Sequence, residues 1–317
     1  MKNLFVFGIL FWSTAAVAAD PAAPAPIPPP EESRRELAGH IFLPSQVVFD
    51  PFVTTHIGES TGFGYAAFRL GTTDNGQKTN HDLQFAFLQQ TFDFQVAPMK
   101  WWAVHVQLGG TVQSGIDADS ALIRGAEVGY VVGAGAIFSW KLGRVRLGAG
   151  FDFNYSPFYG LSPLTALQAS AAAGKVDTTT LFTSADNLNL RPSLLMAIGL
   201  HRALGLRLTI DYDHLFSGSA LPDTDELNFG GLMDIDLHQV SKAPVGILLG
   251  YKIGVIVSGA VAGDNGIEHA LTAGIFYTGR RNLALGLEAL LFFPRFETNQ
   301  TDYLRVSATF DLRYYWN

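Results

Sequence analysis

Hydrophobic and polar residues alternate along most of the chain, in runs of about a dozen positions separated by turn-rich breaks. The clearest run is the last one. Its apolar phase contains Leu304, Val306, Ala308, Phe310, Leu312, Tyr314 and Trp316, and its polar phase Arg305, Ser307, Thr309, Asp311 and Arg313. Successive side chains of a β-strand point to opposite faces, so this pattern predicts a strand with one apolar and one polar face. Similar runs occupy 102–108, 144–155, 206–213 and 228–238, which predicts an all-β chain.

Strand length and break length distinguish a membrane barrel from a soluble sandwich. A strand that crosses a bilayer needs about 9–11 residues, whereas ordinary strands average about 5–6. Short and long breaks also alternate strictly, as periplasmic turns and extracellular loops do in outer-membrane barrels. The short breaks lie near 97–100, 141–143, 202–204, 241–244 and 279–281, and the long ones near 72–81, 114–126, 156–189, 218–226, 258–267 and 294–302. We therefore predict a transmembrane antiparallel up-and-down β-barrel of about 12 strands.

One segment also permits a helical interpretation. Residues 243–263 carry Lys252 as their only charge before Asp264, and glycines recur at every fourth position from Gly246 to Gly254. The segment nevertheless keeps a two-residue apolar phase and is rich in β-branched residues, which favours a strand. In the longest loop, Ser162 followed by Pro163 and, later, Gly174 predicts one short helix.

The first part of the chain differs from the rest and divides into three segments. Residues 1–19 combine Lys2, a short apolar stretch and small residues, the pattern of a cleaved signal peptide. Residues 20–38 are rich in Pro and Ala, which predicts a disordered linker. Residues 39–59 are too apolar to remain in water and form a candidate lumen plug. The barrel is expected over 60–317.

Composition narrows the classes of function. The 317 residues contain no Cys, which excludes disulfides and thiolate chemistry, and a net charge of -7 gives no reason to expect a nucleic-acid partner. Aromatic residues gather at predicted periplasmic strand ends, as in an interfacial girdle. These residues are Trp101, Trp102, Trp140, Tyr314, Tyr315 and Trp316.

These features together resemble bacterial outer-membrane β-barrel proteins of Gram-negative bacteria. The terminal phase Phe310, Leu312, Tyr314 and Trp316 is similar to the C-terminal signal of that class, although Asn317 follows the last aromatic residue. The resemblance implies an outer-membrane location, contact with outer-membrane lipid, and recognition of the C-terminal strand by the barrel-insertion machinery. It does not select a subfamily.

The polar phases supply the candidate pore-lining residues, which we expect to form ion pairs across the lumen. They are His105, Arg146, Asp152, Arg207, Asp211, Asp213, Asp234, Asp236, Lys252, Glu288, Arg305, Asp311 and Arg313. Two Asp/His groupings also invite comparison with outer-membrane proteases. His214 is out of phase with Asp211 and Asp213, and the pair Asp236 and His238 lies at the expected periplasmic end. We therefore expect no catalytic residues, no metal and no cofactor.

The leading hypothesis is a porin-like narrow channel or transporter for a small solute. A structural, assembly or surface-interaction barrel without transport is the first alternative, and an outer-membrane hydrolase is the second. The longest loop could fold inward as a constriction, and residues 39–59 could close the lumen from the periplasmic side. We expect a small acidic excess in the lumen to give a weak cation preference.

Overall fold

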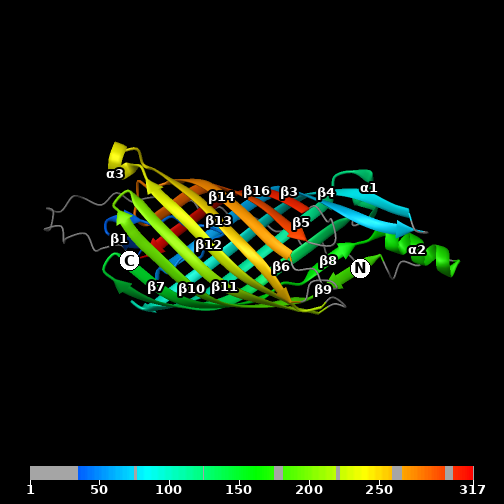
Figure 1. Ribbon diagram of the computed structural model, residues 1–317, viewed down its shortest axis with the longest axis horizontal. Helices are drawn as coiled ribbons and strands as arrows, with labels where there is room; N and C mark the ends of the chain where they lie inside the picture. Colours follow the sequence, from blue (N-terminus) through cyan, green and yellow to red (C-terminus); the bar gives the residue numbers. More distant parts are fainter. Residues whose placement is uncertain are drawn as a thin grey trace, which may run out of the picture. The chain divides into compact units, whose positions relative to one another are not determined.

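The computed structural model describes residues 35–74, 77–123, 125–174, 181–218, 222–258, 266–296 and 303–316. Within these ranges the chain forms a closed antiparallel barrel of 12 strands (Figure 1). The strands are β3 (Thr55–Asp74), β4 (Gln77–Met99), β5 (Trp102–Gly115), β6 (Ala126–Leu142), β7 (Val145–Tyr155), β10 (Asn187–His201), β11 (Leu204–Ser217), β12 (Thr224–Asp236), β13 (Val245–Ser258), β14 (Gly266–Tyr277), β15 (Leu283–Phe296) and β16 (Tyr303–Trp316).

Successive barrel strands pair with one another, and pairing of β16 with β3 closes the wall. The register joins Trp316 to Thr55 and Tyr303 to Phe68, so the closing pair is continuous over the whole of β16. A closed barrel satisfies every strand edge, which is required of a sheet surrounded by lipid. The all-β, up-and-down barrel of about 12 strands predicted from the sequence is confirmed.

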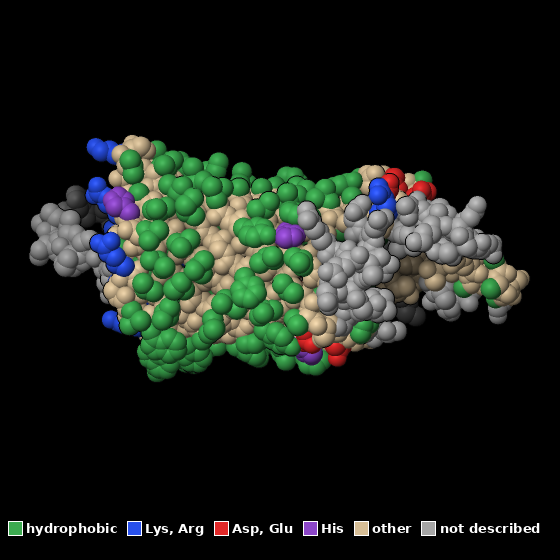
Figure 2. All heavy atoms as spheres, viewed as in Figure 1, with side chains coloured by type: hydrophobic (Ala, Val, Ile, Leu, Met, Phe, Trp, Pro, Cys, Tyr) green, Lys and Arg blue, Asp and Glu red, His purple; other side chains and the backbone are tan. Residues whose placement is uncertain are grey.

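The outer surface of the barrel is apolar and the inner surface is polar. In β16 the side chains of Leu304, Val306 and Phe310 are exposed, whereas those of Ser307 and Thr309 are buried inside. On the outer surface, Figure 2 shows a broad band of hydrophobic side chains, with Lys and Arg gathered at the end where α3 lies in Figure 1. Such a band is the lipid-facing belt of a membrane barrel.

The two ends of the barrel differ in the length of their connections. At one end, here called the turn end, α3 (His238–Ser241) lies in the connection between β12 and β13, and the C-terminal strand ends there. At the other, the loop end, α1 (Ala118–Ile123) follows β5, while β8 (Phe158–Leu161), α2 (Pro163–Ala173) and β9 (Phe182–Ala185) lie between β7 and β10. Helix α2 begins after Ser162 and ends at Gly174, whose left-handed φ of 62° caps it, as the sequence predicted. No helix in the described part of the chain has the length and hydrophobicity needed to cross a membrane.

Several expected boundaries are wrong. The first barrel strand begins at Thr55 and not at residue 60, because residues 55–59 already pair with β16. Residues 72–81 are not a long loop, since β3 and β4 remain paired out to Asp74 and Gln77. Residues 35–38, expected in the linker, belong to the folded part of the chain. The predicted signal peptide and the rest of the predicted linker lie outside the described residues.

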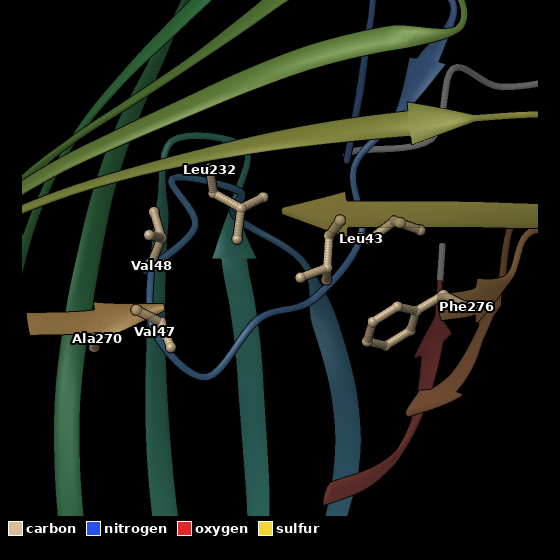
Figure 3. Close-up of a cluster of buried hydrophobic side chains, with 7 residues drawn as sticks. Leu43, Val47, Val48, Leu232, Ala270 and Phe276 are labelled. Carbon is tan, nitrogen blue, oxygen red and sulfur yellow. The ribbon is translucent and has the colours of Figure 1, made fainter. Parts of the chain in front are cut away.

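Residues 35–54, which we call the lumen segment, lie inside the barrel. Strands β1 (Glu36–Leu37) and β2 (His40–Ile41) form a small hairpin, whose two-residue turn puts both Ala38 and Gly39 at positive φ. The following chain packs against the inner wall, and Figure 3 shows Leu43, Val47 and Val48 directed at Leu232, Ala270 and Phe276. The lumen segment thus buries its apolar side chains against an apolar part of the inner wall.

Candidate functional site: the lumen

Apolar contacts hold the lumen segment against one part of the barrel wall. Leu43, Val47 and Val48 share a buried cluster with side chains of β12, β13 and β14, and β15 adds Leu290 and Phe292. A second cluster joins Leu37, Phe42 and Phe52 to Ala197 of β10. Burial of such side chains contributes about 1.5–3 kcal/mol each before entropic costs. The segment is therefore docked mainly on the wall from β10 to β15.

Polar contacts hold the lumen segment in two places, one at the turn end and one deeper in the lumen. At the turn end, the Arg35 guanidinium donates to the carbonyl oxygens of Phe42 (3.0 Å) and Arg281 (2.9 Å) and lies 4.3 Å from the centre of the Tyr315 ring. Deeper in the lumen, Glu288 of β15 accepts hydrogen bonds from the Ser45 hydroxyl (2.8 Å) and the Gln46 backbone N–H (3.0 Å). Tyr315 thus faces the interior and is not part of the aromatic girdle, unlike the exposed Trp101, Trp140, Tyr314 and Trp316.

Space remains between the lumen segment and the opposite wall. A cavity of about 330 Å³ is lined by the segment and by β3, β4, β5, β6, β7, β10 and β16. Its walls carry two similar groups of side chains. In the β4 cluster, Asp93 binds His56 (2.8 Å) and Arg313 (3.8 Å). In the β7 cluster, Asp152 binds His105 (2.6 Å) and Arg191 (3.6 Å).

A second cavity of about 200 Å³ lies against the wall from β10 to β15. Both cavities are lined by Gln46, Phe49 and Arg191, so they adjoin at these side chains. The Arg191 guanidinium lies 4.1 Å from the centre of the Phe49 ring, a cation–π contact that separates the two spaces. Carboxylates of Asp213, Glu226 and Glu268 line the second cavity together with the Lys252 ammonium group.

Six of the thirteen candidate pore-lining residues form three pairs with one another. Arg207 and Asp234, both fully buried, share a two-pronged contact of 3.1 Å between adjacent strands. Lys252 approaches Asp211 at 3.4 Å, and His105 approaches Asp152. All three pairs join neighbouring or next-but-one strands. The expected pairing across the lumen is absent from the described residues because the lumen segment lies between the opposite walls.

The other seven candidates have different partners. Arg313 binds Asp93, Arg305 donates to Gln89 (2.9 Å), and Arg146 donates to the Ser139 hydroxyl (3.2 Å). The remaining four are carboxylates that accept hydrogen bonds from neutral side chains: Asp213 from Asn189, Asp236 from Thr278, Glu288 from Ser45 and Thr272, and Asp311 from Ser60.

Six charged or titratable residues that line the two cavities were not among the candidates predicted from the sequence, and these are Asp50, His56, Asp93, Arg191, Glu226 and Glu268. Asp93 had a usable signal, since it alternates with the outward-facing Phe92 and Phe94. His56 was hidden by the misplaced start of the barrel. Asp50 lies in the lumen segment, 3.9 Å from Arg207, a contact that no strand pattern could indicate.

The two Asp/His groupings considered for catalysis are not assembled as such. His214 binds Asp225 (2.5 Å) and does not contact Asp211 or Asp213. Strand β12 ends at Asp236 and His238 begins α3, so the alternating run predicted over 228–238 extends past the end of the strand. Within the described ranges, no group of three or more His, Asp and Glu side chains is arranged to hold a metal ion.

Solved structures show the same architecture. The translocator domain of the autotransporter NalP from Neisseria meningitidis matches with a TM-score of 0.50 and 12% identity, over 83% of this chain and 89% of that one. An outer membrane channel from Pseudomonas putida F1 matches with a TM-score of 0.50 and 12% identity, over 86% of this chain and 99% of that one. No protein-family model and no curated protein sequence matches.

At this identity the likeness concerns the fold alone. The closed 12-strand barrel and its lipid-facing belt define a bacterial outer-membrane β-barrel protein, located in the outer membrane. In such barrels the short turns face the periplasm and the long loops face outward. The turn end is therefore the periplasmic end, and the lumen segment is inserted from the periplasmic side.

Proposed function

We propose that this protein is a narrow channel for a small polar solute, closed by the lumen segment in the conformation described here. The observation that carries the proposal is the pair of adjoining cavities, which meet where Phe49 of the segment contacts Arg191 of the wall. A barrel of about eight strands is filled by its own side chains, whereas 12 strands leave space that a separate segment can fill or vacate.

The wall around the cavities is suited to a polar solute. Carboxylate, guanidinium, imidazole and amide groups line the larger cavity, beside the apolar side chains of Phe49, Phe52, Ile137 and Leu195. A solute that passes must exchange hydrogen bonds with water for hydrogen bonds with these groups. The Phe49–Arg191 contact lies where the two cavities meet, and movement of the segment would widen the proposed route at this point.

Planar-bilayer recording on the purified protein tests this proposal. We expect Phe49→Ala to increase single-channel conductance, and deletion of residues 36–53 to increase it further. Phe94→Ala removes an equivalent ring from the lipid-facing surface and is the matched control, with no expected change. A heat-dependent gel shift establishes that each variant is a folded barrel.

The outcome separates the channel from the structural alternative. A folded deletion variant without conductance would contradict the proposal, because the space vacated by the segment would then not connect the two sides. The barrel without transport would become the leading hypothesis.

A further inference from the structure

Two of the three carboxylates that line the larger cavity have an arginine partner of their own. Asp93 and Asp152 each contact one arginine within the β4 and β7 clusters. Asp50 lies 3.9 Å from Arg207, which is already paired with Asp234 at 3.1 Å. A charged solute would have to displace one of these partners or bring an uncompensated charge into a confined space, and both are costly. The ionic groups of this cavity therefore favour a solute without net charge.

The cavity also contains polar side chains with no protein partner. Among the described residues, the side chains of Thr91, Gln107 and Ser193 make no hydrogen bond, although all three line the cavity from different strands. Ser193 is only 7% exposed, so its hydroxyl is buried beside the cavity. Hydroxyl and amide groups both donate and accept hydrogen bonds, which suits a ligand that itself carries several hydroxyl groups.

Size and surroundings limit the ligand further. About 330 Å³ is at the lower end of the roughly 300–1,000 Å³ range of small-molecule sites. An apolar ligand would leave the polar groups of the wall without partners, at a cost of about 1–3 kcal/mol for each buried group. We propose that this cavity binds a small, neutral, polyhydroxylated solute of monosaccharide size. This inference deepens the proposed function and rests on it for the route by which the solute enters.

Three sugars of similar shape and different charge provide the probes. Titration calorimetry on the full-length protein in detergent at about pH 7.5, where an ordinary histidine is mostly neutral, would compare glucose, glucuronate and 6-amino-6-deoxyglucose. We expect glucose to bind at least about tenfold more tightly than either charged analogue. Equal or tighter binding of a charged analogue, or no binding of any of the three, would overturn the inference.

Near-isosteric variants locate the site. We expect Thr91→Val, Gln107→Leu and Ser193→Ala each to weaken glucose binding by about two- to tenfold, as loss of one neutral hydrogen bond does. Thr209→Val is the control, because Thr209 is buried in the barrel interior but does not line this cavity. A loss of binding in the control as large as in the three variants would contradict the assigned position.

Binding and passage are measured separately, so the two proposals can fail independently. Binding of glucose by a barrel that never conducts would support this site and contradict the channel. Conductance with equal flux of the three sugars into liposomes, and no saturable binding, would support the channel and overturn the site.

Discussion

At the scale of single residues, neighbouring positions of one strand face two different solvents. Val106 of β5 is exposed on the outer belt, whereas Gln107 lines the larger cavity. A lipid-facing Arg near the bilayer midplane costs about 2–4 kcal/mol, but a lumen Arg can remain hydrated. We expect Val106→Arg to lower the free energy of unfolding by that amount, and Gln107→Arg to lower it by less than half as much, in urea titrations of the barrel in lipid vesicles.

Packing inside the barrel makes Val106 and Gln107 a better pair for this comparison than a belt leucine and its neighbouring glycine. Leu249 and Leu287 are exposed on the belt, and Gly250 and Gly286 are their neighbours on the lumen side. A Cβ at Gly286 would lie 2.3 Å from the Phe276 ring, and one at Gly250 would lie 2.7 Å from Thr272. Crowding would therefore destabilise those variants for another reason. Equal destabilisation at Val106 and Gln107 would contradict the assignment of the two faces.

At the scale of elements, the docked lumen segment contains a buried histidine. His40 is fully buried in β2, where its ring packs edge-on against Phe42. Burial lowers the pKa of His40 to about 4, with the positive charge of Arg207 acting in the same direction and Asp236 opposing it. The docked segment thus holds a neutral imidazole, whereas a released segment would have an ordinary histidine.

This difference predicts weaker docking in acid. As the pH falls from about 6.5 toward 4, the released state gains a proton that the docked state does not, at a total cost to docking of up to about 3 kcal/mol. The chain has no Cys, so a single Val47→Cys substitution introduces a unique thiol in the docked segment. We expect its labelling at about pH 5 to reach a greater extent than at about pH 7.5, after correction for thiol reactivity.

His40→Phe is the control for that measurement. Phenylalanine fills a similar volume and does not titrate, so the corrected extent of labelling should then be nearly the same at both pH values. An acid-dependent increase that persists in His40→Phe would assign the effect to other groups of the segment, such as Glu36 or Asp50, and contradict the role of His40.

The sequence predicts some elements well and others poorly, for physical reasons. Alternation in β16 is visible because lipid on one side and polar groups on the other constrain every position between Leu304 and Trp316. The outer ends of β3 and β4 extend beyond the expected loop boundary, where no lipid imposes alternation. The lumen segment was expected from its apolar content, but its docking on β10 to β15 depends on contacts distant in sequence.

At the scale of the whole molecule, charged side chains are distributed unevenly along the barrel. Exposed basic residues occupy the periplasmic turns, and these are Lys100, Lys141, Arg144, Arg202, Lys242, Arg280 and Arg281. Acidic residues line the cavity nearer the outer loops. The sequence could not show which lumen charges pair with one another. Asp211 and Asp234 belong to the acidic excess from which a cation preference was expected, but they are paired with Lys252 and Arg207.

We therefore expect the cation preference to arise from carboxylates other than Asp211 and Asp234. Asp213, Glu226 and Glu268 line the second cavity, which is the one nearer the outer loops, and they form no ion pair with a described residue. Glu226 faces the lumen, while its neighbour Asp225 contacts Tyr212 and His214 near the outer rim. In reversal-potential measurements across a KCl gradient, we expect the double substitution Glu226→Gln and Glu268→Gln, made in the deletion variant, to reduce the preference for K⁺ over Cl⁻ by about two- to fivefold at low salt. Asp225→Asn changes one charge at the same height of β12 and should have a smaller effect. If Asp225→Asn reduces selectivity as much as the double substitution does, the preference for K⁺ arises at the outer rim of the barrel, and the second cavity does not set it.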